Sequence, residues 1–213
     1  MGSVLFLGSY YKLLLSVRQH HDDGILGGTR GNPGAARDDD TTARSQTGRW
    51  ILPRQGHVKL NVDAAFFKDM GKATVGVVAR DEKGDVLLAS GRMLFHCSDA
   101  EEAELLACRE GFTLALHWIS QPITLETDCL TVCAALKSSV ENRSRVALLL
   151  WEVKQLMAEL REVEICHCKR SQNRVSHLLA NKACVESLCK VWLHRAPDFV
   201  ATALATDCNP SES

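Results

Sequence analysis

The chain has 213 residues, of which 46% are apolar and 24% charged, with a formal net charge of -1 at pH 7. This composition is that of a globular protein, and the length suffices for one ordinary domain with a sizeable core and an additional arm or tail. The near-zero net charge excludes a protein that binds nucleic acid over most of its surface, so any contact with a polyanion must come from a local basic patch.

The spacing of the cysteines and the length of the apolar runs indicate whether the chain binds structural zinc or crosses a membrane. The nine cysteines form no C-x-x-C pair and their number is odd, which argues against structural zinc. Most lie inside apolar periodic segments, which indicates small buried thiols in a reducing intracellular compartment, the nucleus or the cytoplasm. No apolar run is long enough to cross a bilayer, because Lys12 interrupts the best candidate, between Val4 and Val17. We therefore expect no membrane segment.

The N-terminal part of the chain is rich in Gly, Asp and other polar residues. Residues 1–49 are predicted to form a disordered arm or linker, residues 50–207 the folded domain, and residues 208–213 a tail. The glycines of the arm are not followed by Gly-Lys-Ser/Thr, so coil is favoured over a phosphate-binding loop.

The predicted domain opens with a strand over 58–66, in which apolar and polar side chains alternate. Asp63 lies in the middle of this strand, where Asp packs poorly and competes for backbone hydrogen bonds. Two interpretations fit: a solvated edge strand, or a metal-binding carboxylate at the centre of a sheet. Strands over 73–80 and 86–95 follow after short Gly-containing turns, so the three predict an antiparallel meander.

The apolar period then changes to that of helices. Ser98, with Glu101 three residues later, is predicted to cap a helix that runs to about Trp118. The remaining elements are a strand over 123–127, helices over 130–140 and 145–160, a strand over 162–169 and a helix over 173–190. This order predicts an α/β fold with a five-stranded mixed sheet, three antiparallel strands followed by parallel ones, and helices on both faces.

Three acids stand at comparable places in this pattern: Asp63 mid-strand, Glu104 one turn into the first helix, and Asp128 at the carboxyl end of the fourth strand. Each has a plain structural explanation, since Glu104 belongs to an acidic first turn and Asp128 can cap the next helix. Together, however, they can converge, and their repulsion is tolerable only with cations between them. Hard oxygen ligands suit Mg²⁺ or Mn²⁺, and paired ions serve phosphodiester chemistry.

Five motifs occur in order along the predicted domain. They are Trp50-x-x-Pro53, Val58-Lys59-Leu60-Asn61-Val62-Asp63-Ala64-Ala65-Phe66, Ala103-Glu104-Leu105-Leu106-Ala107-x-Arg109-Glu110-Gly111, Glu126-Thr127-Asp128-Cys129 and Arg170-x-x-Asn173-x-x-Ser176-His177-x-Leu179-Ala180. Together they resemble the type 1 ribonuclease H domain, in the plant branch related to reverse transcriptases of retrotransposons without long terminal repeats. The resemblance covers about Trp50 to Asp207.

The resemblance implies the ribonuclease H-like fold and an endonuclease that hydrolyses the RNA strand of an RNA–DNA hybrid. In the family, carboxylates matching Asp63, Glu104 and Asp128 hold two Mg²⁺ ions, for which Mn²⁺ can substitute. We expect no small-molecule cofactor and a monomeric protein. Asn173 matches a residue of the hybrid-binding groove, and contacts to 2′-hydroxyls would explain a requirement for RNA in one strand.

His177 stands where many family members have a fourth metal-binding Asp. Neutral imidazole is a softer ligand that Mg²⁺ rarely selects and Mn²⁺ tolerates better. Three roles are open for His177: a ligand through water, a catalytic proton shuttle, or a surface residue without a role. His167 is a weaker candidate, because strand alternation places it with Val163 and Ile165, where burial is expected.

Basic residues could supply a phosphate patch beside the acids or be scattered solvated charges. The candidates are Arg143, Arg145, Lys169, Arg170 and Arg174. Arg170 and Arg174 flank Asn173 and are the preferred nucleic-acid contacts. Two other functions are weighed for the domain: a non-catalytic nucleic-acid-binding remnant of a retrotransposon ribonuclease H domain, and a related two-metal nuclease with another substrate.

Overall fold

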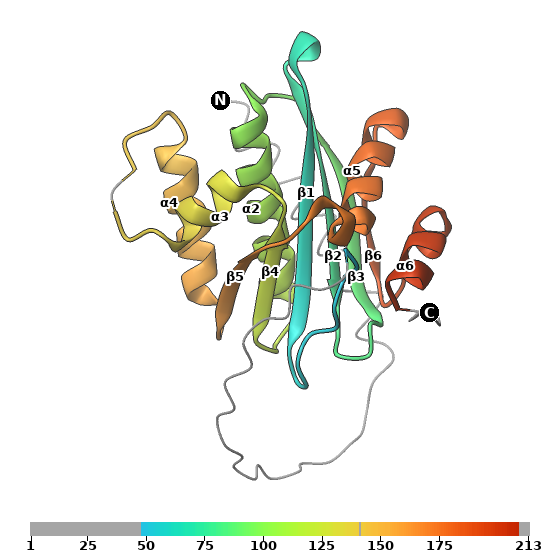
Figure 1. Ribbon diagram of the computed structural model, residues 1–213. Coiled ribbons are helices and arrows are strands. Elements are labelled where there is room, and N and C mark those ends of the chain that lie inside the picture. The colour runs from blue at the N-terminus through green and yellow to red at the C-terminus, as the bar shows by residue number, and fades with distance from the viewer. Residues whose placement is uncertain (1–47, 141, 209–213) are drawn as a thin grey trace. The chain divides into compact units, whose positions relative to one another are not determined.

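The computed structural model describes residues 48–140 and 142–208 (Figure 1). Nearly all of the predicted arm (1–49) and of the predicted tail (208–213) lies outside these residues. Within the described part, none of the helices is both long and apolar enough to span a membrane.

A mixed sheet of six strands forms the centre of the fold, in the order β5-β4-β1-β2-β3-β6. The strands are β1 (Val58–Phe67), β2 (Lys72–Arg80), β3 (Val86–Leu94), β4 (Ile123–Thr127), β5 (Val163–His167) and β6 (Cys189–Leu193). As predicted, β1 to β3 form an antiparallel meander, and β4 and β5 run parallel to β1. The predicted turn glycine, Gly84, has φ of 85°, so its lack of a side chain is needed there.

The sixth strand was not predicted. The helix expected over 173–190 ends at Glu186, because Ser187 adopts a left-handed conformation with φ of 50°. The chain then extends along β3 as an antiparallel edge strand. Val191 and Trp192 favour this extended conformation over a helix, and the prediction of five strands was therefore one short.

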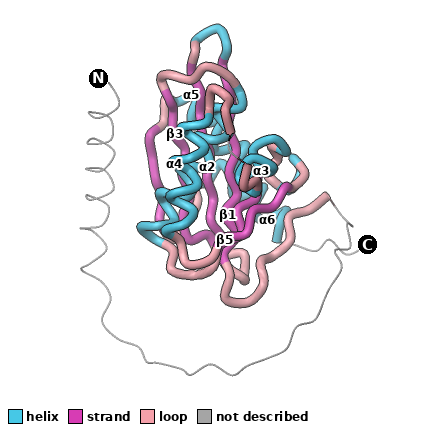
Figure 2. The backbone as a smooth tube through the Cα atoms, turned by 90° about the vertical axis from the view of Figure 1, so that its left-hand side faces the viewer, coloured by secondary structure: helices cyan, strands magenta, loops and turns pink. Residues whose placement is uncertain are grey.

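Helices cover both faces of the sheet, as predicted. They are α2 (Ala100–Trp118), α3 (Leu130–Lys137), α4 (Ala147–Glu159), α5 (Arg174–Glu186) and α6 (Ala201–Cys208), with short 3-10 turns η1 (Lys68–Met70), η2 (Arg170–Gln172) and η3 (Asp198–Val200). Figure 1 shows α2, α3 and α4 on one side of the sheet and α5 and α6 on the other. In the view of Figure 2, α4 packs against α2 from the outside.

Helix α2 begins one residue later than the sequence suggested. Asp99, not Ser98, is the N-cap, and its side chain accepts a hydrogen bond of 2.9 Å from the backbone N–H of Glu102. Glu102 in turn accepts from the backbone N–H of Ser98, the residue before the N-cap, at 2.9 Å, so both carboxylates bind free N–H groups at the start of the helix. Arg145 forms ion pairs with both carboxylates and fastens the segment before α4 to the start of α2.

Strand β1 is packed between helices of the two layers. Leu60 and Val62 face α2, where a Cβ at Gly111 would lie 2.9 Å from Val62 Cγ1. The alternate side chains, Asn61 and Asp63, face the opposite layer and bond to residues at the start of α5. The strand therefore carries an apolar contact on one face and a polar site on the other.

Candidate active site

Asp63 and Asp128 lie at the same level of the parallel strand pair β1–β4. Because β1 has β2 on one side and β4 on the other, the interpretation of Asp63 as part of an edge strand is wrong. Asn61 pairs with Glu126, and each acid lies two residues further along its chain. Strand β4 ends at Thr127, whereas β1 continues to Phe67. Both acids therefore lie at the carboxyl end of β4, where the pairing between the two strands stops.

Glu104 approaches the two strand acids from α2, which packs on the opposite face of the sheet from α5 (Figure 1). One carboxylate oxygen from each of Asp63, Glu104 and Asp128 lies within 4.8 Å of the others. Glu104 Oε2 is buried and has no hydrogen-bond partner among the described residues. The capping acids of the first turn are Asp99 and Glu102, so Glu104 is not needed at the helix terminus. The predicted convergence of the three acids is thus present.

The electrostatics of the three acids favour a bound cation. Burial raises the pKa of Glu104 to about 9, and the negative charges of Asp63 and Asp128 add to this effect. Burial and the charge of Asp128 raise the pKa of Asp63 to about 6. A divalent cation would remove this repulsion and would give the buried Glu104 oxygen a partner. An all-carboxylate donor set fits Mg²⁺ or Mn²⁺.

His177 contacts the acidic group through Asp63. Its Nδ1 lies 2.8 Å from Asp63 Oδ2, and its Nε2 lies 2.9 Å from Asn181 Nδ2. The amide NH₂ of Asn181 can only donate, so Nε2 accepts and Nδ1 carries the proton that is donated to Asp63. Sequence reasoning missed Asn181, although its spacing of four residues from His177 on a helix is a signal for such a pair.

Gly76 permits this contact. It pairs directly with Asp63 across β1 and β2, so both positions point toward α5. A Cβ at Gly76 would lie 2.0 Å from Ser176 O and 2.5 Å from Ala180 N, which the packing of α5 cannot accommodate. The glycine inside the predicted strand over 73–80 was the sequence signal for this close approach.

Asn173, the N-cap residue of α5, is hydrogen-bonded to Asp128. Its side chain is 1% exposed, and its Nδ2 donates to Val62 O at 2.8 Å and to Asp128 Oδ1 at 3.4 Å. Asn173 therefore bonds to residues of the site itself. The N-cap of α3 is Cys129, so the interpretation of Asp128 as a helix cap is wrong.

The predicted basic patch divides into two groups. Arg170 and Arg174 are exposed near the start of α5, and Arg170 lies close enough to lower the pKa values of Asp63 and Glu104. Arg145 is instead engaged with the capping acids of α2. His167 is exposed, with Nε2 at 3.3 Å from the backbone oxygen of Asp128, so the expected burial of His167 is wrong.

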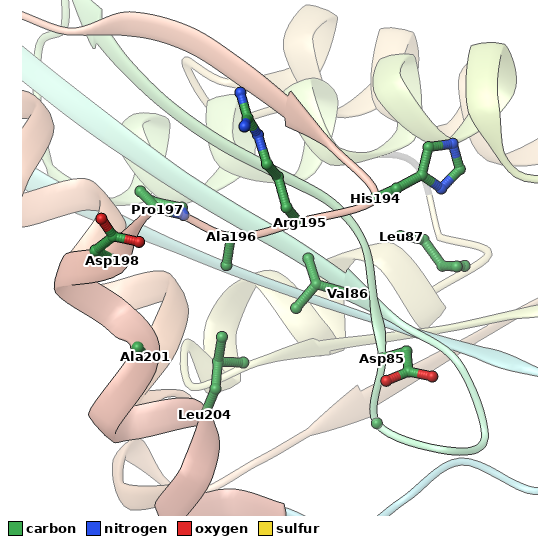
Figure 3. A pocket seen from close by; sticks show the side chains of 11 residues that line it. Asp85, Val86, Leu87, His194, Arg195, Ala196, Pro197, Asp198, Ala201 and Leu204 are labelled. Carbon is green, nitrogen blue, oxygen red and sulfur yellow. The ribbon is translucent and has the colours of Figure 1, made fainter.

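A separate cavity lies apart from the three acids, and none of the described cysteines shares their candidate metal site. Within 48–140 and 142–208, the three acids are the one group of His, Cys, Asp or Glu residues placed to share a metal ion. A cavity of about 550 Å³ between the β2–β3 turn and the segment that joins β6 to α6 is lined by residues such as Val86, Ala196 and Leu204 (Figure 3). None of the three acids lines this cavity.

Comparison with known sequences identifies relatives of the whole site. A family model described as "Reverse transcriptase-like" matches residues 61–183, which include the three acids, Asn173 and His177. A protein of Arabidopsis thaliana, provisionally named as a ribonuclease H protein, is 28% identical over 158 residues, which are 74% of this chain and 25% of the relative. The chain thus spans about a quarter of the length of the curated relative it matches.

Comparison with solved structures shows the fold. RNase H1 of the archaeon Halobacterium salinarum superimposes with a TM-score of 0.58 at 22% identity, over 62% of this chain and 99% of that chain. LC11-RNase H1, isolated from compost, was crystallised with an RNA/DNA hybrid, and that structure gives a TM-score of 0.56 at 17% identity, over 61% of this chain and 98% of that chain. The N-terminal RNase H domain of a Mycobacterium tuberculosis protein gives 0.54 at 16% identity, over 63% and 100%.

Proposed function

Because this chain belongs to the reverse transcriptase-like family and has the fold of a type 1 ribonuclease H domain, we propose that it is a metal-dependent endonuclease that hydrolyses the RNA strand of an RNA–DNA hybrid. The observation that carries the proposal is the convergence of Asp63, Glu104 and Asp128, whose carboxylate oxygens lie within 4.8 Å of one another. A crystal structure of the similar LC11-RNase H1 with an RNA/DNA hybrid supports the choice of substrate.

The three acids would hold two Mg²⁺ or Mn²⁺ ions. Such ions, when bound, supply the positive charge that activates a water molecule and stabilises the leaving 3′ oxygen. The other residues of the site orient the acids. Asn173 donates to Asp128, and His177 donates to Asp63, so each strand acid has its own hydrogen-bond donor. We assign His177 to this supporting role, which differs from direct or water-mediated ligation.

Contacts to the hybrid would come from exposed cations beside the acids. Arg170 and Arg174 would bind phosphates and gain affinity by releasing condensed counterions. Asn173, which lies between them in sequence, is enclosed and would act through Asp128. Arg145 is left out of this surface because it is already paired with Asp99 and Glu102.

A non-catalytic remnant is not favoured by the geometry of the acids. A module that only binds nucleic acid gains nothing from three crowded carboxylates, since they repel both each other and the phosphates of the ligand. Burial and mutual repulsion raise the pKa of Glu104 to about 9, which is a cost in stability that metal binding would remove.

The test is cleavage of a labelled RNA–DNA hybrid by the full chain in Mg²⁺ and, separately, in Mn²⁺. We expect cleavage of the RNA strand, its loss in Asp63→Asn, and normal activity in Asp69→Asn, which changes an exposed Asp in the β1–β2 connection. Binding of hybrid without cleavage in either metal would establish the non-catalytic remnant. Equal cleavage of duplex RNA or duplex DNA would establish a nuclease of different specificity.

A further inference from the structure

We infer that a buried chain of hydrogen bonds sets the orientation of Asp128. It runs from Asp207 in α6 through Arg80, Asn61 and Asn173 to the Asp128 carboxylate. Asn61 and Arg80 are therefore positioning residues for the metal site, although neither contacts the acids that would bind metal. The inference rests on the proposed function in one respect, that Asp128 is a metal ligand.

Asn61 is the branching point of this chain. Its side chain is fully buried, and its Oδ1 accepts from Trp50 Nε1 at 3.0 Å and from Arg80 Nη2 at 3.2 Å. Its Nδ2 donates to Glu126 Oε2 at 2.9 Å and to Asn173 Oδ1 at 3.3 Å. Both acceptor sites and both hydrogens of the amide are thus used, so no rotation of Asn61 leaves the others satisfied.

The direction of every bond in the chain is determined by chemistry. An indole N–H and a guanidinium can only donate, so the oxygen of Asn61 must face Trp50 and Arg80. The NH₂ group of Asn61 must then face Asn173, whose Oδ1 accepts from it and from Ser176 Oγ at 2.7 Å.

The second amide is fixed by the first. With its oxygen turned to Asn61 and Ser176, Asn173 presents its NH₂ to Val62 O and to Asp128 Oδ1, which can only accept. Trp50 and Arg80 can only donate, and Val62 O and the Asp128 carboxylate can only accept. The amides of Asn61 and Asn173 therefore have a single orientation that satisfies all of these groups. In that arrangement a hydrogen bond points at the Asp128 carboxylate.

Arg80 is the anchor of the chain. It is 1% exposed, and its guanidinium carbon lies 3.4 Å from the centroid of the Trp50 ring. Its Nη1 lies 2.7 Å from Asp207 Oδ2, and the side chain of Asp207 is 6% exposed. A guanidinium fork can serve Asp207 and Asn61 together, whereas the single ammonium of Lys cannot reproduce this geometry.

The protein contains a second buried ion pair that serves as a matched control. Arg92 and Glu110 lie 2.7 Å apart, with side chains 7% and 2% exposed. This pair joins β3 to α2, and neither partner belongs to the hydrogen-bond chain from Asp207 to Asp128. Arg92→Lys should therefore cost stability as Arg80→Lys does, but it should leave the orientation of Asp128 unchanged.

The experiment compares Arg80→Lys, Asn61→Asp and Arg92→Lys with the wild type, all as full chains. Mg²⁺ and Mn²⁺ affinities are measured by calorimetry, and the side-chain amide signals of Asn173 are measured by NMR without metal. Asn61→Asp keeps an acceptor for Trp50 and Arg80 but places a second acceptor against Asn173 Oδ1. We expect Arg80→Lys and Asn61→Asp to shift the Asn173 signals and to weaken metal binding by up to about 10-fold, the lower end of the range for direct partners of ligating residues, because both act through Asn173. Arg92→Lys should do neither.

The inference would be overturned if Arg80→Lys and Asn61→Asp fold but leave the Asn173 signals and the metal affinity unchanged. The hydrogen-bond network would then have only a structural role. Should Asn61→Asp fail to fold, Arg80→Lys and Asp207→Asn decide the outcome by the same measurements. The two proposals fail separately. Shifted Asn173 signals with weakened metal binding, in a wild type that cleaves no hybrid, would refute only the nuclease. Normal cleavage and normal metal binding in every folded variant of Arg80, Asn61 and Asp207 would refute only the positioning role.

Discussion

His177 donates a hydrogen bond of 2.8 Å from Nδ1 to Oδ2 of Asp63. The bond spans the interface between α5 and the sheet, and the other ring nitrogen accepts from Asn181 at 2.9 Å. Both nitrogens of the imidazole are thus engaged with protein groups. The histidine thus supports Asp63, one of the three acids of the site, and restricts the rotation of its carboxylate.

Loss of this support should weaken catalysis more than folding. In His177→Ala, Asp63 loses its hydrogen-bond donor and can rotate, so we expect kcat on a hybrid to fall about 10- to 100-fold, the range found for partners of metal ligands. The side chain is 30% exposed, so the melting temperature should change little. Steady-state kinetics and thermal unfolding provide the check. An unchanged kcat would remove His177 from the proposed mechanism.

Gly76→Ala should separate α5 from the sheet. Its new methyl group would lie 2.0 Å from Ser176 O, and overpacking of this kind costs about 1–3 kcal/mol or more. Because Gly76 pairs with Asp63, displacement of α5 should also break the His177 contact and lower activity. Gly91→Ala is the matched control, since its methyl would meet Leu179 O at 3.2 Å. Urea unfolding should show the smaller loss for Gly91→Ala, and equal losses would contradict the packing argument.

Glu104→Gln should stabilise the metal-free protein, increasingly so as the pH rises. The folded-state pKa of Glu104 is about 9, against an ordinary value of 4.5, so the folded state retains a proton that the unfolded state releases in this window. The free energy of unfolding of the wild type therefore falls with pH, by at most about 1.4 kcal/mol per pH unit. Gln carries no such proton. Urea unfolding in EDTA at pH 5 and pH 8 should show the variant's advantage widening, and a constant difference would refute this electrostatic account.

Removal of single cations should change the salt dependence of hybrid binding. Arg170→Ala and Arg174→Ala should each weaken binding and reduce the slope of log affinity against log salt by about 1, because each releases fewer counterions. Arg145→Ala is the control, since Arg145 is paired with Asp99 and Glu102. Fluorescence anisotropy at several salt concentrations measures the slopes. A reduced slope in Arg145→Ala alone would place the hybrid on a different surface.

Local patterns were enough to predict the meander and α2. The alternation over 58–66 and the helical period up to Trp118 depend on residues adjacent in sequence, and both match β1 and α2 closely. The three acids were located because a strand centre, a strand end and a helix turn are local features whose convergence follows from topology. The family resemblance then supplied the chemistry.

Contacts between distant residues explain what the sequence did not reveal. Nothing near His177 or Arg80 in the sequence shows that the first bonds to Asp63 and the second to Asp207, because those bonds depend on how α5 and α6 pack against the sheet. Strand β6 was missed because its pairing with β3 competes with helix propensity, and that competition is decided by tertiary structure.

The ion pair between Arg80 and Asp207 also bears on the order in which the protein is made. The partners are 127 residues apart, so the guanidinium on the second strand leaves the ribosome long before its carboxylate. A buried charge without its partner costs about 3–5 kcal/mol, so the sheet around Arg80 should stay hydrated until α6 is synthesised and docks. Synthesis of α6 would thus complete this ion pair, and a growing chain that already contains all three acids but not α6 would still lack it.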